Sequence, residues 1–284
     1  MSEPILEARN VEYAYPGGIV GLAGVTLAVD AGEKLALLGA NGCGKTTLLL
    51  SLCGVLKPRS GEVRLSGRLV EYTRAGLRNL RQRVGTLLQD ADDQLFAGSI
   101  YEDVSFGPLN LGCTEAETRQ RVEQALAAME LTDLGDRPPY RLSGGQKKRT
   151  ALAGVAAMKP AVILLDEPTA NLDPHASTDL LALLDQMHGQ GTTIVFSTHD
   201  VDLAYAWADR IAVLDGGRVS ACGSPEEIFG DGQAVRGSGL RTPWVLDVVN
   251  ALQPSALWPS ELRPPRTPAA LVKQLAAMRI ENVR

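Results

Sequence analysis

Residues 39–46 read Gly-Ala-Asn-Gly-Cys-Gly-Lys-Thr, which fits the pattern G-x-x-x-x-G-K-[ST], and no other feature of the chain constrains its fold as strongly. The apolar run 34–38 before the pattern predicts a buried strand and the run 47–52 after it predicts a helix, which is the context that the pattern requires. Glycines let backbone N–H groups face an anion, and the helix N-terminus adds partial positive charge. We therefore expect a bound phosphate chain, with Lys45 at its β- and γ-phosphates and the Thr46 hydroxyl on Mg²⁺.

Two adjacent acids end a second strand that the sequence predicts to be buried. The apolar run 162–165 leads directly into Asp166 and Glu167. A carboxylate in that place is suited to the Mg²⁺ shell, so Asp166 is the expected metal ligand and Glu167 the expected general base for the attacking water. Either acid alone is compatible with a solvated turn, but the pair after an apolar strand favours catalysis.

A second anion-binding helix end is predicted between these two strands. Residues 142–146 read Leu-Ser-Gly-Gly-Gln and are followed by a helix-compatible run over 147–158. Ser143 is a good N-cap residue, and the two glycines allow a phosphate to approach the backbone closely.

With these motifs the chain resembles, over roughly residues 5–230, the ATP-binding cassette (ABC) family, whose signature is LSGGQ. Six features occur in the order that the family shows: Tyr15, Gln89, the signature at 142–146, the pair Asp166-Glu167, Asp173 and His199. The resemblance implies an α/β P-loop fold with a RecA-like parallel-sheet core, an antiparallel β subdomain and a helical subdomain at about 90–158. It also implies that residues 1–232 form the ATP-binding domain.

The resemblance further implies that two cassettes pack head to tail, so that each ATP lies between one chain's phosphate loop and the other chain's signature helix. Tyr15, with Tyr13 as its only nearby rival, is then expected to stack on adenine, and His199 to contact the γ-phosphate. Gln89 is expected to complete the Mg²⁺ shell with Thr46 and Asp166 and to signal to a membrane partner. The residues expected to act in hydrolysis are Lys45, Gln89, Glu167 and His199. Those expected to contact ATP are Tyr15, Gly39, Asn41, Gly42, Cys43, Gly44, Lys45, Thr46, Thr47, Ser143, Gly144, Gly145, Gln146 and Asp173.

Composition indicates an energy-converting subunit that does not itself cross a membrane. The net charge of -5 over 284 residues argues against a nucleic-acid partner. No apolar run approaches the ~18 residues that a transmembrane helix needs, and residues 1–4 lack the basic flank and apolar core of a signal peptide. The four cysteines form no C-x-x-C pair, so we expect a reduced, cytosolic protein without disulfides. The resemblance implies that it lies on the cytoplasmic face of the cell membrane. Cys43 is expected either to be its most reactive thiol, because the helix dipole and Lys45 lower a thiol pKa, or else to fill a small-residue position with its sulfur packed away.

Short alternating strands predict an antiparallel sheet within the first 75 or so residues, and strands and helices alternate from 160 to 215. Capping boxes are predicted at Thr114 with Glu117 and at Ser224 with Glu227, and Asp173 before Pro174 predicts a further helix start.

Beyond residue 230 the sequence changes character, and residues 233–284 are expected to form a helical extension. Residues 231–239 are glycine-rich and polar, as in a linker. Thr242-Pro243 and Thr267-Pro268 each place a threonine at N-cap and a proline at N1, so each predicts a short helix. The extension is either a packed tail on the cassette or, as we favour, a dimerisation element.

The stretch after Gln89 indicates a branch of the family. Residues 89–96, 100–108 and 110–112 look like the ATPases of energy-coupling-factor (ECF) importers, which take up vitamins or Co²⁺ and Ni²⁺, and the whole chain looks closest to the cobalt and nickel subunits. The implied partners are a second copy of the chain, a transmembrane scaffold and, through the scaffold, a substrate-binding membrane subunit. Asp90, Asp92 and Asp93 are suited to receive arginines of the scaffold, or else form a solvated turn.

The transported metal itself has no predicted site in this chain. The sequence has three histidines, and none shares ligand spacing with a cysteine or carboxylate cluster. Metal specificity is therefore expected in another subunit, and neither cobalt against nickel nor the vitamin alternative is decided by this chain. A soluble ABC protein acting on DNA or ribosomes would carry long insertions or a second cassette, and a non-hydrolysing adaptor would lack Glu167, so a transport ATPase is favoured.

Overall fold

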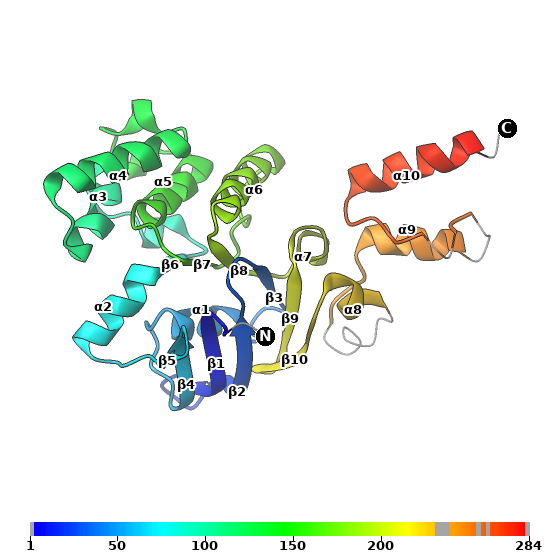
Figure 1. Ribbon diagram of the computed structural model, residues 1–284, viewed down its shortest axis with the longest axis horizontal. Helices are drawn as coiled ribbons and strands as arrows, with labels where there is room; N and C mark the ends of the chain where they lie inside the picture. The colour runs from blue at the N-terminus through cyan, green and yellow to red at the C-terminus, as the bar shows by residue number, and fades with distance from the viewer. Residues whose placement is uncertain (1–2, 231–238, 254–256, 260–261, 282–284) are drawn as a thin grey trace.

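The computed structural model describes residues 3–230, 239–253, 257–259 and 262–281, and contains two β-sheets flanked by helices (Figure 1). The larger sheet has the strand order β10 (Arg218–Gly223), β9 (Arg210–Asp215), β3 (Lys34–Leu38), β8 (Thr193–Thr198), β7 (Val162–Leu165) and β6 (Val84–Leu87). The smaller, antiparallel sheet has the order β2 (Val20–Val29), β1 (Leu6–Ala14), β4 (Ser60–Leu65) and β5 (Arg68–Leu69). The expected α/β class is confirmed.

Five neighbouring strands of the larger sheet, from β9 to β6, run parallel. Leu35 of β3 pairs with both Val195 and Arg210, and Leu87 of β6 pairs with Leu165 of β7. Because parallel strands all end at the same edge of a sheet, the segments that follow β3, β7 and β8 meet there. This edge gathers the phosphate loop, the acid pair and His199.

Helices cover the sheets and form a separate bundle above them. α1 (Lys45–Leu52) follows β3 directly, and α2 (Arg74–Arg83) leads into β6. The bundle at the upper left of Figure 1 consists of α3 (Ile100–Leu111), α4 (Glu115–Ala128) and α5 (Gly144–Ala157). The chain then adds α6 (Pro174–Gly189), α7 (Val201–Trp207) and α8 (Pro225–Gly230). Throughout the described ranges, no helix is both long and apolar enough to cross a membrane.

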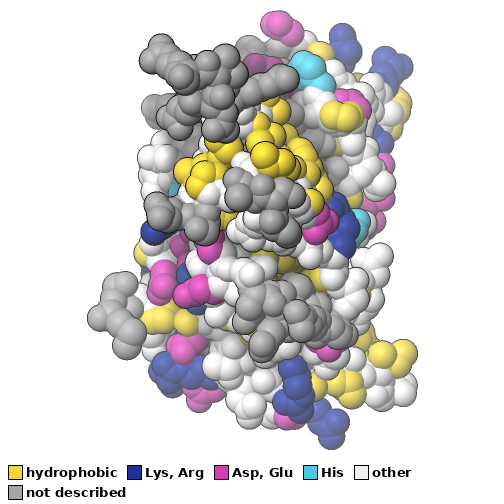
Figure 2. Space-filling model, turned by 90° about the vertical axis from the view of Figure 1, so that its right-hand side faces the viewer, with side chains coloured by type: hydrophobic (Ala, Val, Ile, Leu, Met, Phe, Trp, Pro, Cys, Tyr) yellow, Lys and Arg dark blue, Asp and Glu magenta, His cyan; other side chains and the backbone are white. Residues whose placement is uncertain are grey.

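The extension lies at one end of the molecule, at the right of Figure 1, and consists of α9 (Trp244–Leu252) and α10 (Pro268–Glu281). It has a small core of its own around Val249, Trp258 and Leu271. Figure 2 shows apolar side chains gathered on the upper part of this face of the molecule, and Val272 and Leu257 are 66% and 61% exposed. The extension therefore has a packed interior and also an apolar surface.

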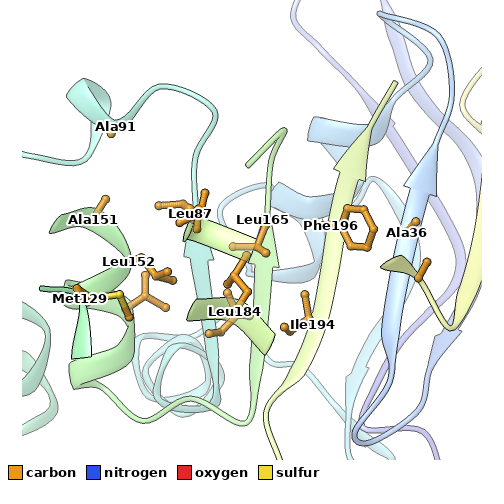
Figure 3. Packing of buried hydrophobic residues seen from close by; sticks show 14 of the residues in the cluster. Ala36, Leu87, Ala91, Met129, Ala151, Leu152, Leu165, Leu184, Ile194 and Phe196 are labelled. Atoms are coloured by element: carbon orange, nitrogen blue, oxygen red, sulfur yellow. The ribbon is translucent and has the colours of Figure 1, made fainter. Parts of the chain in front are cut away.

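Two larger cores lie on opposite faces of the parallel sheet. Along β3, Leu35 and Leu37 pack between the two sheets, whereas Ala36 and Leu38 pack against the helices on the other side. Figure 3 shows the helix-side core, in which Leu165 of β7 lies between Leu87 of β6 and the pair Ile194 and Phe196 of β8, while Leu152 of α5 lies beside Met129. Because side chains alternate across a strand, a strand buried on both faces is apolar without interruption, which is why 34–38 and 162–165 are recognisable in the sequence.

Most helix boundaries follow the expected capping signals. Thr114 and Glu117 form the reciprocal capping box of α4, and Ser224 and Glu227 exchange the same two hydrogen bonds ahead of α8. Asp173 accepts from the Ala176 N–H at the start of α6. Thr267 likewise accepts from the Ala270 N–H at α10. These expectations are confirmed.

One boundary prediction is wrong, and several elements have no counterpart among our expectations. Pro243, not Thr242, occupies the N-cap of α9, and the N–H of Trp244 is bound by Asp202 of α7 at 2.8 Å. A long-range partner thus replaces the local cap that the Thr-Pro pattern predicts. The elements not anticipated include α2 and the hairpin of β9 and β10, whose turn begins at the Asp215-Gly216 signal. The predicted linker at 231–239 lies, up to residue 238, outside the described residues.

Candidate nucleotide site

The phosphate loop joins β3 to α1 along a path that only glycine permits at two places. Gly44 caps α1 with φ of 110°, and a Cβ there would lie 2.6 Å from the carbonyl oxygen of Gly21. A Cβ at Gly39 would lie 2.4 Å from the carbonyl oxygen of Leu214. Both contacts are with backbone and cannot be relieved by a side-chain movement, so the glycines of the pattern are required by the fold of the loop.

The inside of the loop offers positive charge and free donors. Lys45 is buried, and its Nζ lies 2.7 Å from the carbonyl oxygen of Gly39 and 3.8 Å from Oε1 of Glu167. The N–H groups of Gly42, Gly44 and Thr46 make no hydrogen bond to any residue that the structure describes. Unpaired N–H groups at a helix N-terminus beside an ammonium group are suited to an anion with several oxygens, such as a phosphate chain.

Two hard oxygen ligands meet beside the loop. The Thr46 hydroxyl donates to Oδ2 of Asp166 at 2.7 Å, and the Ser197 hydroxyl donates to Oδ1 of the same carboxylate at 2.5 Å. Two oxygens from protein fit Mg²⁺, which retains waters and takes its remaining ligands from phosphates. Among the described residues, no group of three or more His, Cys, Asp or Glu side chains could hold a metal ion.

The second acid of the pair faces the end of β8. Glu167 has φ of 45°, a left-handed value, and its N–H donates to the Ser197 hydroxyl at 2.9 Å. This turn brings both carboxylate oxygens of Glu167 within 3.0 Å of Nδ1 of His199. The carboxylate is buried while His199 is mostly exposed. A buried carboxylate held by a neighbouring imidazole at the mouth of a phosphate loop has the geometry of a general base.

The aromatic and amide residues of the expected site are carried by two different segments of the chain. The Tyr15 hydroxyl hydrogen-bonds Oγ1 of Thr47 at 3.0 Å in the first turn of α1, and the Tyr13 ring packs edge-on against Tyr15. Gln89 follows β6, whose register with β7 places it level with Glu167, and its side chain is exposed.

Gln94 is a residue that we did not predict. It bonds the backbone of both Thr86 and Leu88 and so fixes the segment that carries Gln89. Its only sequence signal is a second glutamine five residues after Gln89.

The signature residues lie apart from this loop, at the N-terminus of α5. Ser143 and Gln146 form a reciprocal capping box, so the side chain of Gln146 is used to cap the helix. A Cβ at Gly144 would meet nothing within 4 Å, and one at Gly145 would make only an ordinary 3.4 Å contact with Ala176. The packing of this chain therefore leaves room for side chains at both positions. Ser143, both glycines and Asp173 instead line a cavity of about 220 Å³.

The expected lowering of the Cys43 thiol pKa is wrong, and the alternative, a sulfur that is packed away, is confirmed. Cys43 is buried, at 7% exposure, and its side chain packs beneath Gly39 in the core between the sheets. Burial raises the pKa of the Cys43 thiol, although the nearby ammonium of Lys45 acts in the opposite direction. Desolvation of the thiolate in the core therefore outweighs the favourable effects of the loop's backbone N–H groups and of Lys45.

Comparison with known proteins agrees with the fold and the motifs. The family model described as "ABC transporter" matches residues 22–170. The chain is 52% identical over 273 residues to the cobalt import ATP-binding protein CbiO of Rhodobacter capsulatus, covering 96% of this chain and 98% of that protein. It is 48% identical over 251 residues to the energy-coupling factor transporter ATP-binding protein EcfA2 of Methanospirillum hungatei, covering 88% of this chain and 63% of that protein. The chain belongs to the ABC transporter family and is an ATP-binding subunit of the ECF type.

Solved structures give the same result. The cbiO1 protein of Clostridium perfringens, described as part of the transporter complex cbiONQ, superposes with a TM-score of 0.74 at 40% identity, over 88% of this chain and all of that one. A dimeric ATP-binding cassette in a post-hydrolysis state with ADP and Pi superposes with a TM-score of 0.71 at 28% identity, over 78% of this chain and 98% of the other. The enzyme class is accordingly an ABC transport ATPase.

Proposed function

We propose that this chain is the ATP-hydrolysing subunit of an ECF-type importer for Co²⁺ or Ni²⁺, bound to the cytoplasmic face of the cell membrane. The observation that carries the proposal is the 52% identity to a cobalt import ATP-binding protein along nearly the whole of both chains. A vitamin-uptake ECF transporter is the second candidate, because energy-coupling factor ATP-binding proteins are also among the relatives.

In the proposed site, ATP lies across the loop between Tyr15 and the edge of the sheet. The contact of Tyr15 with α1 supports Tyr15 over Tyr13 as the adenine platform. The phosphates are then held by the loop residues Gly39, Asn41, Gly42, Cys43, Gly44, Lys45, Thr46 and Thr47. Gly39 and Cys43 contribute through their backbone groups. Mg²⁺, when bound, polarises the γ-phosphate and is held by Thr46 and Asp166, with Gln89 completing its shell.

Glu167 accepts a proton from the attacking water in this proposal, and Lys45 neutralises charge on the phosphates. His199, at 3.0 Å from Glu167, holds the carboxylate and reaches toward the γ-phosphate. Positioning and charge neutralisation provide most of the rate enhancement in phosphoryl transfer, so a buried base with a fixed partner is what the reaction needs.

The signature helix is proposed to serve the nucleotide of a second copy of the chain. The supporting observation is that Gly144 and Gly145 are not required by this chain's own packing and face a cavity together with Ser143 and Asp173. A phosphate can approach the backbone closely at these glycines, but the phosphate loop of the same chain lies elsewhere. This separation supports a head-to-tail homodimer with two ATP molecules between the subunits.

A transmembrane scaffold is proposed to dock on the segment after Gln89 and on α3. Phe96 and Phe106 pack edge-on with ring centroids 4.8 Å apart, yet they are 66% and 52% exposed. Such a pair beside an exposed acid, Asp93, fits an amphipathic helix that carries arginines. Asp92 is already paired with Lys147, so it contributes less to this surface than its neighbour.

The extension at 233–284 is proposed to help hold the two copies together. The supporting observations are that Val272 and Leu257 of the extension are exposed and that apolar side chains gather on the face shown in Figure 2.

The test is ATP-dependent uptake by the complex that co-purifies with this chain from detergent-solubilised membranes. Proteoliposomes containing that complex should accumulate radioactive Co²⁺ with Mg-ATP, and unlabelled Ni²⁺ should be tested as a competitor. The Glu167→Gln variant serves as the control without hydrolysis. Uptake of a vitamin without uptake of either metal would support the second candidate instead.

A further inference from the structure

A buried lysine ties the signature helix to the loop that carries the proposed base. Lys148 of α5 is 4% exposed, and its Nζ donates to the carbonyl oxygens of Glu167, Pro168 and Ala170 at 3.1, 2.7 and 2.9 Å. All three N–H bonds of the ammonium group are thus directed at one short segment of backbone. Within the described part of the chain, no other donor reaches the carbonyls of Pro168 and Ala170.

The segment that Lys148 holds is turned sharply at both of its ends. Glu167 and Asn171 both have left-handed backbone conformations, with φ of 45° and 62°. Asparagine tolerates this conformation, but for a glutamate it is unfavourable, so the backbone of Glu167 has to be fixed by its surroundings. Three hydrogen bonds from one buried cation provide that constraint, and they act on the backbone that directs the Glu167 carboxylate toward His199.

Lys148 also stands between the two nucleotide-facing parts of one chain. It lies five residues after Ser143, at the start of α5, and the segment it binds continues into Asn171 and Asp173, which line the signature cavity. In the proposed dimer, Ser143 contacts one ATP while Glu167 of the same chain acts on the other. A displacement of α5 is therefore transmitted to the Glu167 loop through Lys148.

We propose that Lys148 is a positioning residue for ATP hydrolysis, which holds the Glu167 loop in its reactive conformation and couples it to the signature helix. This rests on the proposed role of Glu167 as base. Burial lowers the pKa of Lys148 to about 8, while the carboxylates of Glu167, Asp90 and Asp166 favour its charged form. The three carbonyl oxygens around this buried position need three N–H donors, which an ammonium group provides and a neutral side chain does not.

The adjacent lysine provides a matched control. Lys147 is on the same turn of α5, but its Nζ points outward and pairs with the exposed Asp92 at 2.6 Å. Lys147→Met and Lys148→Met remove the same charge from neighbouring positions, and they differ in whether backbone carbonyls lose their donor. Exposed ion pairs contribute little, so the first change should be nearly silent.

The experiment measures kcat and the equilibrium Kd for Mg-ATP in the purified full chain. Lys148→Met should lower kcat by about tenfold to 100-fold, because a displaced base is costly, while the ATP Kd stays within about threefold. Lys148→Gln, which keeps two donors, and Lys148→Arg, which keeps charge and donors, should give intermediate rates in the order Lys, Arg, Gln, Met. Lys147→Met should retain kcat within about twofold.

A double variant tests whether Lys148 acts through Glu167. In the Glu167→Gln background, adding Lys148→Met should reduce the remaining rate by no more than about twofold, since the base is already absent. A further tenfold loss there, or equal losses for Lys147→Met and Lys148→Met, would overturn the inference. If Lys148→Met does not show a cooperative thermal transition, it is not folded and Lys148→Gln takes its place as the test variant. A wild-type kcat in Lys148→Gln would then contradict the inference.

The Glu167→Gln and Lys148→Met variants together distinguish a failure of the proposed function from a failure of the inference about Lys148. If Glu167→Gln hydrolyses ATP at the wild-type rate, the assignment of the base is wrong and the role of Lys148 falls with it. If Glu167→Gln is inactive but Lys148→Met is fully active, only the inference about Lys148 is rejected.

Discussion

At the scale of single residues, the chemistry of the site depends on one left-handed turn. Glu167 is directed toward His199 because its backbone φ is positive and its N–H is held by Ser197. The same serine donates to Asp166, so one hydroxyl sets the orientation of both acids. Neighbouring acids on the same strand end can thus have separate roles, one with Thr46 and one with His199.

Replacing Glu167 by glutamine should separate binding from hydrolysis. Glutamine keeps the shape and hydrogen-bonding capacity of the side chain but cannot accept a proton from water. We expect the ATP Kd to stay within about threefold and kcat to fall by about 100-fold or more. Equilibrium binding and phosphate release measured on the same preparation check this, and a wild-type rate of phosphate release would exclude Glu167 as the base.

The cysteines should react in an order set by exposure. Cys222 is exposed, Cys113 is half-buried, and Cys43 and Cys53 are buried. The raised pKa of Cys43 also leaves little thiolate at neutral pH, and the thiolate is the reactive form. A maleimide at pH 7 should therefore modify Cys222 before Cys43, as measured by peptide mass spectrometry. ATP binding should be retained after Cys222 is modified. Modification of Cys43 ahead of Cys222 would show that its sulfur is more accessible than the structure indicates.

At the scale of elements, the extension is fastened to the cassette by specific polar contacts. Asp202 of α7 accepts from the Trp244 N–H at the start of α9 and pairs with Arg241. Arg266, just before α10, makes two hydrogen bonds to Glu226 of α8 and one to the carbonyl oxygen of Ala208. α7 begins immediately after His199 and Asp200, so the extension contacts the helix that directly follows His199.

Asp202→Ala should loosen α9 without unfolding the cassette. The change removes the side-chain cap that Asp202 provides to α9 and an exposed ion pair, which together contribute about 1–2 kcal/mol. Hydrogen exchange followed by mass spectrometry should therefore show faster exchange across Trp244–Leu252, while α4 exchanges as in the wild type. Thr114→Ala is the matched control, because it removes the cap of α4 and should affect that helix alone. Equal exchange of α9 in wild type and Asp202→Ala would mean that its apolar core, not the cap, holds the helix.

The elements differ in how far the sequence predicts them, for physical reasons. Strands buried on both faces, such as 34–38, are uninterrupted apolar runs, and helices with local caps, such as the one after Thr114, have their signal within four residues. The start of α9 depends on Asp202, about 40 residues earlier, so its local Thr-Pro signal misleads by one position. The site motifs predict which residues gather at the sheet edge, whereas the roles of Ser197, Gln94 and Lys148 depend on contacts between distant segments.

At the scale of the whole molecule, the two proposed halves of the nucleotide site are separate within one chain. The phosphate loop is at the edge of the parallel sheet, and the signature cavity is at the N-terminus of α5 beside α6. One chain therefore presents a phosphate loop in one place and a second anion-binding helix end in another. The central claim of this account is that two chains combine these halves into two complete ATP sites.

Mixing two inactive variants tests that claim most directly. Lys45→Ala removes charge from the phosphate loop, and Ser143→Arg places a long side chain in the signature cavity, so each homodimer has no intact site. A mixed dimer has one site that combines the intact loop of the Ser143→Arg chain with the intact signature of the Lys45→Ala chain. Equimolar mixing should therefore restore ATP hydrolysis to up to about a quarter of the wild-type rate, because about half of the dimers are mixed and each has one good site. A mixture no more active than the sum of the separate variants, at concentrations where the wild type is dimeric, would contradict the account.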